Sequence, residues 1–395
     1  MRQDTPVAVT GMGIITASGN DLASNMAALE NETATVSQPP FDTDFTSPVF
    51  LCSLDAPEQP DATGSCSRTL LLALHAAREA FSSAGFHDIP IKNLRLGVVV
   101  GTSVGASLNF FSYYKATAFG ETPSLDEIDE YLNSNPALAI GHIFQSCGPA
   151  LTVTNACSSG ADAIGLAAGW IRLGLCDIAL AGGADAISDI TYKGFNSLRL
   201  TSQEICRPFD IARQGLTLGE GAAFMLLESE SSRRRRGAAA KSFISGYGTA
   251  TDAHHITAPH PQCRGLKSAV CQAFAQAGTN WCSIAFCNAH GTGTPTNDAA
   301  EGGFLHAECP ELPFIATKGV TGHTLGAAGA VEAIFTAVHL NGGILPPSPR
   351  FAEADPAIGA APVCKPTKIQ GDMAVSQSLA FGGNNSVLVL SRGEI

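Results

Sequence analysis

Short glycine-rich segments carry the residue types in this chain that could do covalent chemistry. In the first, residues 154–160, Cys157 lies between an apolar run and a stretch of small residues. A thiol at such a strand-to-helix turn meets free N–H groups and the positive end of the helix dipole, which lower the thiol pKa. The other cysteines lie scattered in apolar segments without paired spacing and are expected to be reduced structural thiols. Cys157 is therefore the predicted nucleophile.

Two further segments carry histidine and lysine. His290 follows a predicted strand and opens the glycine-rich turn of residues 288–294. Lys318 and His323 share the glycine-rich loop of residues 317–329, which leads into a helix of small residues. A tight turn beside an imidazole favours a side chain that points into a site. The His290 turn alone fits a structural histidine about equally well. Lys318 could be a surface residue, but its glycine-rich setting favours a buried position.

The last segment is the turn of residues 381–385, which begins at Phe381. Its glycines free backbone N–H groups to point at an oxyanion. One cysteine, two histidines and one lysine in such turns at strand ends form a coherent set for acyl transfer.

Strand and helix patterns alternate along the chain and predict a layered α/β fold. The predicted strands cover residues 7–11, 96–100, 151–153, 178–180, 242–248 and 284–288, with the last ones inside 373–389. The predicted helices cover residues 67–85, 158–173, 265–277 and 326–340. A similar order of elements resumes after an arginine-rich stretch, residues 233–236, which we interpret as a solvated linker. Two units are therefore predicted, residues 1–240 and 241–395.

Composition limits the possible partners and locations. The 395 residues are 45% hydrophobic and 15% charged, with a formal net charge of −12. Such a charge disfavours nucleic acid, and an acidic carrier would need a local basic patch. No apolar run approaches the roughly 20 residues that span a bilayer, and the start does not read as a signal peptide. We expect a cytoplasmic protein.

The order of motifs resembles the elongating β-ketoacyl–acyl carrier protein synthases of the thiolase superfamily, nearly from end to end. The motifs are VTGMG (9–13), ACSSG (156–160), RPFD (207–210), GEGA (219–222), DAHHITAP (252–259), HGTGT (290–294), KGVTGHTLGAAG (318–329) and FGG (381–383). The resemblance implies a thiolase-like five-layer αβαβα sandwich of two pseudo-related halves.

The resemblance also implies roles for single residues. Cys157 would be the nucleophile, His290 and His323 the paired histidines, Lys318 their supporting lysine, Glu332 its acidic partner, and Phe381 the gate of the acyl pocket. The backbone N–H groups of Cys157 and Phe381 would form the oxyanion hole. The enzyme would transfer an acyl group to the thiol and condense it with decarboxylating malonyl-carrier, with no metal or organic cofactor.

The implied partners are acyl- and malonyl-loaded acyl carrier protein, docked near Arg68 and Arg207. The protein would work as a homodimer, or as a heterodimer with a related ketosynthase-like subunit. A degradative thiolase is one alternative, but it would need a second catalytic cysteine near the C-terminus. A non-catalytic chain-length-determining subunit is another, but it would lack the nucleophile.

Some positions depart from the usual pattern of this family. Asn155 stands where Ser or Thr is common, and Leu379 and Ala380 precede Phe381 where an aromatic residue and a glycine are usual. These departures leave two pathways open, fatty-acid elongation and a specialised aryl-polyene or polyketide route.

Overall fold

A mixed ten-stranded sheet forms the framework of the protein. The computed structural model describes residues 5–54, 67–86, 95–105, 111–125 and 135–394. The strands of the N-terminal half are β1 (Val7–Thr16), β3 (Leu96–Gly101), β4 (Ala150–Val153), β5 (Ile178–Asp185) and β7 (Gly221–Glu228). Those of the C-terminal half are β8 (Ser242–Thr251), β9 (Ile284–Asn288), β10 (Phe314–Ile315), β13 (Met373–Ala380) and β14 (Asn384–Arg392).

The two halves repeat one strand order. The ladder runs β10-β9-β13-β14-β8-β1-β7-β5-β3-β4, so each half, read outward from its first strand, places its first, fifth, fourth, second and third strands side by side. The halves meet where β1 and β8 pair antiparallel over only three residues each, Val7–Val9 against Ser242–Ile244. The predicted boundary between residues 240 and 241 falls just before β8 and stays a prediction.

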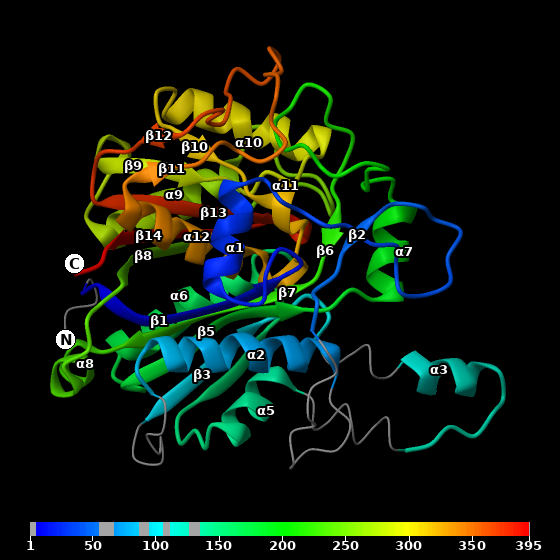
Figure 1. Ribbon diagram of the computed structural model, residues 1–395, viewed down its shortest axis with the longest axis horizontal. Helices are drawn as coiled ribbons and strands as arrows, with labels where there is room; N and C mark the ends of the chain where they lie inside the picture. The colour runs from blue at the N-terminus through cyan, green and yellow to red at the C-terminus, as the bar shows by residue number, and fades with distance from the viewer. Residues whose placement is uncertain (1–4, 55–66, 87–94, 106–110, 126–134, 395) are drawn as a thin grey trace.

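Helices fill three layers around the two halves of the ladder (Figure 1). α2 (Arg68–Ser83) and α5 (Pro136–Ile143) cover the outer face of the N-terminal strands, and α9 (Arg264–Ala277) and α10 (Pro295–Glu308) cover that of the C-terminal strands. α6 (Ser159–Arg172) and α12 (Ala328–Gly342) pack together between the halves. The fold is thus the five-layer αβαβα sandwich that the family resemblance implied.

Smaller elements connect these layers. They are α1 (Leu22–Glu30), β2 (Val49–Phe50), α3 (Phe111–Ala118), α7 (Asp189–Ser197), β6 (Leu218–Gly219), α8 (Glu230–Arg236), α11 (Lys318–Thr321), β11 (Ile344–Leu345), β12 (Thr367–Lys368) and the 3-10 turns η3 (Trp281–Ser283), η4 (Leu325–Ala327) and η5 (Phe381–Gly383). No helix in the described part of the chain has the length and apolar character needed to cross a membrane.

The central layer is made of small residues. Alanines and glycines dominate the buried face of α6, and a methyl group on Gly160 would lie 2.8 Å from the carbonyl oxygen of Gly326. The backbones of α6 and of the turn before α12 therefore approach more closely than larger side chains would allow. This close approach places the N-terminal ends of α6 and α12, and the loops that precede them, next to one another.

The interpretation of residues 233–236 as a solvated linker is wrong. These residues belong to α8, and the side chain of Arg233 is buried and forms ion pairs with Glu230 and Glu394. Arg236 pairs with the fully buried Glu228. The arginines join α8 to β7 and to the end of the chain, since a guanidinium can bind several carboxylate oxygens at once.

Candidate active site

The predicted nucleophile lies in a strained turn between β4 and α6. Ala156 adopts a left-handed conformation, with φ of 50°, which is unusual for a residue with a side chain. The hydroxyl of Ser159 donates to the carbonyl of Ala156 at 2.6 Å and accepts from the N–H of Asn155 at 2.8 Å. Such bonds stabilise the strained conformation of the turn and hold Cys157 at its tip.

The ionisation of Cys157 differs from the sequence expectation. The side chain is buried, and burial raises the pKa of the thiol to about 12, while the charge of Lys318 and the backbone N–H of Phe381 act in the opposite direction. Desolvation of the buried thiolate is the largest of these effects, so the thiol pKa is raised where the sequence led us to expect it lowered. Cys157 rests as a thiol at neutral pH and must lose its proton as it attacks.

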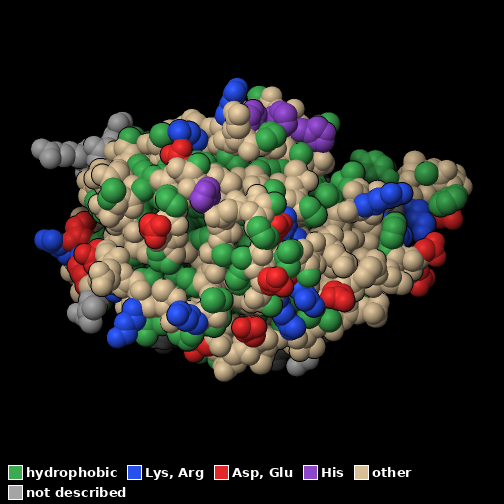
Figure 2. Space-filling model, turned by 90° about the horizontal axis from the view of Figure 1, so that it is seen from above, with side chains coloured by type: hydrophobic (Ala, Val, Ile, Leu, Met, Phe, Trp, Pro, Cys, Tyr) green, Lys and Arg blue, Asp and Glu red, His purple; other side chains and the backbone are tan. Residues whose placement is uncertain are grey.

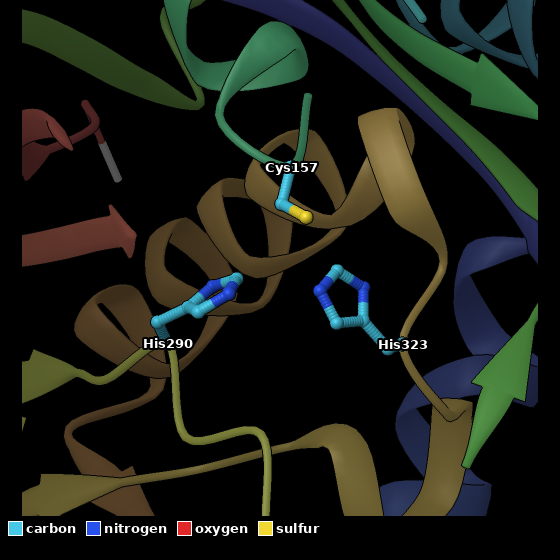
Figure 3. A group of neighbouring side chains, drawn as sticks. All are labelled: Cys157, His290 and His323. Carbon is cyan, nitrogen blue, oxygen red and sulfur yellow. The ribbon is translucent and has the colours of Figure 1, made fainter. Parts of the chain in front are cut away.

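Two histidines from separate loops face this thiol (Figure 3). The Sγ atom of Cys157 and one ring nitrogen each of His290 and His323 lie within 4.8 Å of one another. The two imidazole rings are nearly perpendicular, with centroids 5.2 Å apart. His290 follows β9, whereas the backbone of His323 is tied to the short strand β6 by hydrogen bonds with Thr217 and Gly219. The structure thus gathers three of the sequence-predicted residues at one point.

The hydrogen bonds of the two rings determine which nitrogen carries the proton. The N–H of Leu325 donates to Nδ1 of His323 at 3.1 Å, and Nζ of Lys318 lies 3.2 Å from Nδ1 of His290. A lysine ammonium can only donate, so both Nδ1 atoms are acceptors. Burial, with a smaller effect of Lys318, holds the pKa of both imidazoles well below its usual range. Both rings are therefore neutral near pH 7 and present an Nε2–H.

Lys318 and Glu332 form a buried ion pair behind His290. Nζ of Lys318 donates to Oε1 of Glu332 and to the carbonyl oxygen of His290. Burial raises the pKa of Glu332, and the ammonium of Lys318 opposes that rise. The pair holds His290 through both its ring and its backbone, as expected for a supporting lysine with an acidic partner. The roles of these residues in catalysis stay predictions.

Sequence reasoning missed two buried carboxylates beneath the turn of residues 290–294. Glu301 accepts from the N–H groups of His290 at 2.6 Å and Gly291 at 2.8 Å. Asp298 accepts from the N–H groups of Thr292 and Gly293. Both lie on α10, and burial raises the pKa of Glu301 to about 7. The sequence signal that could have revealed them is a pair of acidic residues three positions apart, shortly after a glycine-rich turn.

The Phe381 turn closes the other side of the site. Gly382 and Gly383 have φ of 83° and 77°, which few other residues adopt, and the ring of Phe381 stacks on Phe195 at 5.2 Å. The N–H of Phe381 lies against the sulfur of Cys157. Ala380 has φ of −129° and ψ of 157°, so a side chain at this position brings no backbone strain.

A pocket of about 110 Å³ gives access to the thiol. Its walls comprise residues from both halves: Cys157, Phe195, Leu200, Leu216, Asp252, Thr257, Ala258, Pro259, His290, Thr292, Thr294, Thr296, Asn297, His323, Leu379, Ala380, Phe381 and Asn385. One thiol and two imidazoles are also a ligand set that suits Zn²⁺. The ammonium of Lys318 beside His290 would repel a dication there, so acyl chemistry fits the set better.

The two arginines suggested for docking are not part of this pocket. Arg68 binds the buried carboxylate of Glu220, to which Nε donates at 3.0 Å, and Arg207 pairs with Glu204 at 3.1 Å on the surface. On the face seen in Figure 2, Lys and Arg side chains lie interspersed with Asp and Glu. Both arginines thus have acidic partners within the chain, and their docking role stays a prediction.

Known proteins with the same fold and motifs give the family. Residues 54–233 match the beta-ketoacyl synthase N-terminal domain and residues 241–352 the C-terminal domain. A 3-oxoacyl-[acyl-carrier-protein] synthase 2 of Staphylococcus aureus is 30% identical over all of both chains. The tetracenomycin polyketide synthase ketoacyl synthase alpha subunit of Streptomyces glaucescens is 32% identical over 84% of this chain and 83% of that one.

A solved structure agrees with these relatives. The ishigamide ketosynthase/chain length factor superimposes with a TM-score of 0.90 at 29% identity and covers 98% of this chain and 99% of that one. The chain is accordingly an acyl-transferring enzyme that forms carbon–carbon bonds, and it belongs to the β-ketoacyl synthase family.

Proposed function

We propose that Cys157 accepts an acyl group from a carrier thioester and that the paired histidines then drive a decarboxylative condensation on it. The observation that carries this proposal is the meeting of the Cys157 sulfur with His290 and His323 within 4.8 Å. In the first step sulfur bonds to the acyl carbon, the carrier thiol leaves, and the proton of Cys157 ends on that thiol. The N–H groups of Cys157 and Phe381 stabilise the tetrahedral intermediate.

The second step uses the neutral imidazoles. Malonyl-carrier loses CO2, and the electrons of the broken bond pass to its thioester oxygen as an enolate. The Nε2–H groups of His290 and His323 donate to this oxygen where negative charge develops. The enolate carbon then attacks the acyl group, a carbon–carbon bond forms, and the thiolate of Cys157 leaves and takes up a proton. Two neutral donors suit this role, since without a donor to Nδ1 neither imidazole would be held in the tautomer that carries the proton on Nε2.

The two rival functions fit the site less well. A chain-length-determining subunit without catalysis needs no nucleophile, whereas this chain places Cys157 in a strained turn facing both histidines. A degradative thiolase would need a second catalytic cysteine where this chain has the Phe381 turn. Condensation uses all of the gathered groups and needs none besides them.

The separation of the two steps tests the proposal. Cys157→Ala should abolish acyl-enzyme formation, read by mass spectrometry, and spare malonyl decarboxylation, read as CO2 release. His290→Ala or His323→Ala should impair decarboxylation more than acylation. Acyl transfer at the wild-type rate by Cys157→Ala would show that another residue is the nucleophile.

The partners belong to the same proposal. Acyl carrier protein would deliver both substrates, in the cytoplasm, and the protein would pair with a second copy or a related subunit. One relative is a polyketide synthase alpha subunit, and the ishigamide structure contains a ketosynthase/chain length factor. Within the described residues β4 pairs only with β3, and Leu151 on it is 41% exposed. An open sheet edge with an exposed apolar side chain favours pairing with another chain. Light scattering of the purified chain, alone and with a related subunit, should report a dimer.

The pathway is a matter of acyl preference. Leu379 and Ala380 line the pocket in place of an aromatic residue and a glycine, and we propose that they favour conjugated or aryl-primed acyl groups over saturated ones. A rigid acyl chain loses less rotational entropy in a fixed pocket. Mass spectrometry of acyl-Cys157 formed from a panel of carriers should show this preference, and Leu379→Phe with Ala380→Gly should reduce it. A wild-type preference for saturated medium chains would instead indicate fatty-acid elongation.

A further inference from the structure

A buried carboxylate on α6 binds both residues that flank the nucleophile turn. Asp162 lies in the first turn of this helix, and its side chain is 3% exposed. Its Oδ2 atom accepts from Nδ2 of Asn155 at 2.6 Å and from Oγ of Ser158 at 2.9 Å. These two residues stand immediately before Ala156 and immediately after Cys157. The carboxylate therefore anchors the strained turn at both ends.

The other oxygen of this carboxylate binds the opposite half of the molecule. Oδ1 accepts from the hydroxyl of Tyr247 on β8 at 2.8 Å and from Oγ of Ser386 on β14 at 2.7 Å. Burial and the nearby carboxylate raise the pKa of Tyr247, so its phenol keeps the proton that it donates. The phenol ring lies against α6 at Gly165, where a methyl group would meet ring carbons at 2.3 Å. Glycine at this position lets the ring reach Asp162.

The strand β14 in turn begins at the Phe381 turn. Nδ2 of Asn385 donates to the carbonyl oxygen of Gly383 at 2.9 Å, and Ser386 is the next residue along the strand. The side chain of Asp162 thus connects the Cys157 turn to β14, the strand that follows the Phe381 turn. Four donors occupy its oxygens, so Asp162 is not free to take the thiol proton.

We infer that Asp162 is a positioning residue, which fixes the sulfur of Cys157 relative to the Phe381 N–H through these four hydrogen bonds. The inference rests on the proposed function, since it concerns acylation of Cys157. Loss of this alignment should slow acyl transfer, because a shift of about 1 Å in reacting groups can cost 10²-fold in rate. Within the described residues, Asp162 forms no hydrogen bond with the loops of residues 290–294 and 317–329, which carry His290 and His323. Decarboxylation should therefore be nearly unaffected.

The first experiment compares Asp162→Leu with Asp162→Asn. The leucine variant should lower the rate constant of acyl-enzyme formation about 10²-fold at saturating substrate, with little change in KM or decarboxylation. The asparagine variant should retain most of the rate, because its oxygen can accept from Asn155 and Ser158 while its amide donates to the two hydroxyls. Equal losses in acylation and decarboxylation, or an asparagine variant as slow as the leucine variant, would overturn the inference.

A second experiment covers the possibility that the leucine variant does not fold. Tyr247→Phe and Ser386→Ala each remove one donor to Oδ1, and neither residue lines the pocket. Each should slow acylation severalfold and spare decarboxylation. Ser242→Ala is the matched control, since it removes a buried serine hydrogen bond from β8 that does not involve Asp162. Wild-type acylation in both Tyr247→Phe and Ser386→Ala would contradict the positioning role.

The outcome separates this inference from the proposed function. Acylation that survives in Cys157→Ala would refute the nucleophile itself, whatever Asp162 does. Acylation that is lost in Cys157→Ala but normal in a folded Asp162→Leu variant would refute only the positioning role.

Discussion

The two halves share a strand order but hold their reactive groups by different means. In the N-terminal half, Cys157 sits on a left-handed turn whose hydrogen bonds come mostly from side chains within a few residues of it. In the C-terminal half, His290 is held from beneath, because buried Glu301 accepts its backbone N–H and Lys318 contacts both its carbonyl and its ring.

This difference suits the role that we propose for each group. In the proposed mechanism the thiol changes bonding partners twice in a cycle, and a compact turn presents it to the pocket while its neighbours stay fixed. In the proposed mechanism the imidazoles act on the substrate only as Nε2–H donors, so their tautomer and orientation matter most. The charged Lys318 sets both for His290, and the N–H of Leu325 sets the tautomer of His323. We therefore expect charge changes to damage the C-terminal half and packing changes to damage the N-terminal half.

The largest effect should come from Lys318→Met, which leaves Glu332 buried without its partner. Breaking a buried ion pair typically costs about 3–5 kcal/mol of unfolding free energy. The double change Lys318→Met with Glu332→Leu should recover much of that stability, by chemical denaturation, yet remain about 10²-fold slower in decarboxylation because His290 has lost its donor. A double variant with restored decarboxylation would show that the lysine serves stability alone.

Glu301→Gln should have the next largest effect. A glutamine oxygen can accept one of the two N–H groups of His290 and Gly291, and its NH2 group must then face the other. Leaving a buried donor unpaired costs about 1–3 kcal/mol, and we expect about a tenfold loss in decarboxylation with acylation less affected. Glu308→Gln, at the far end of the same helix in a surface ion pair with Lys267, is the control. Similar losses in both variants would contradict the comparison.

In the N-terminal half, two glycines of α6 should respond oppositely. Gly165→Ala places a methyl group 2.3 Å from Tyr247 ring carbons and should cost about 1–3 kcal/mol of unfolding free energy. Gly169→Ala meets nothing within 4 Å and should stabilise the helix by about 0.5–1 kcal/mol. Thermal unfolding of the two variants measures both signs. A stable Gly165→Ala would mean that the Tyr247 ring can move without cost.

The most gradual effect is a pH dependence of stability carried by the buried histidines. The pKa of His323 is lowered in the folded protein, so below its ordinary value near 6.5 the unfolded chain binds a proton that the folded one does not. This contribution to stability is present above pH 6.5 and is lost as pH falls, with a slope of up to about 1.4 kcal/mol per pH unit. His323→Asn should flatten the slope between pH 6.5 and 5.

The sequence was most informative where glycine-rich turns follow strands. These turns predicted Cys157, His290, Lys318 and His323 as a set, and the strand ends of a layered α/β fold bring them together as expected. The resemblance added Glu332 and Phe381, which lie in contact with that group. Local sequence patterns reveal such residues because a tight turn requires glycine and other small residues beside them.

Contacts between segments that are distant in the chain have no such local signal in the sequence. Arg68 and Arg207 look alike in sequence, and only the fold shows that one reaches the buried Glu220. Asp162 could not be assigned because its donors Tyr247 and Ser386 are remote in the chain. The pKa of Cys157 was misjudged for a related reason, since the burial that raises it comes from segments distant in the chain.

The narrow seam between β1 and β8 has a consequence for the chain as a whole. Only three residues of each strand pair across it, whereas α6 and α12 cover each other over the central layer. A chain cut between residues 240 and 241 would give two pieces, each with an uncovered inner helix. Neither piece should be soluble alone, but the two made together should assemble as a tight complementing pair. The peptide bond between residues 240 and 241 would then ensure that the two pieces are made in equal numbers, while the packing of α6 against α12 aligns them.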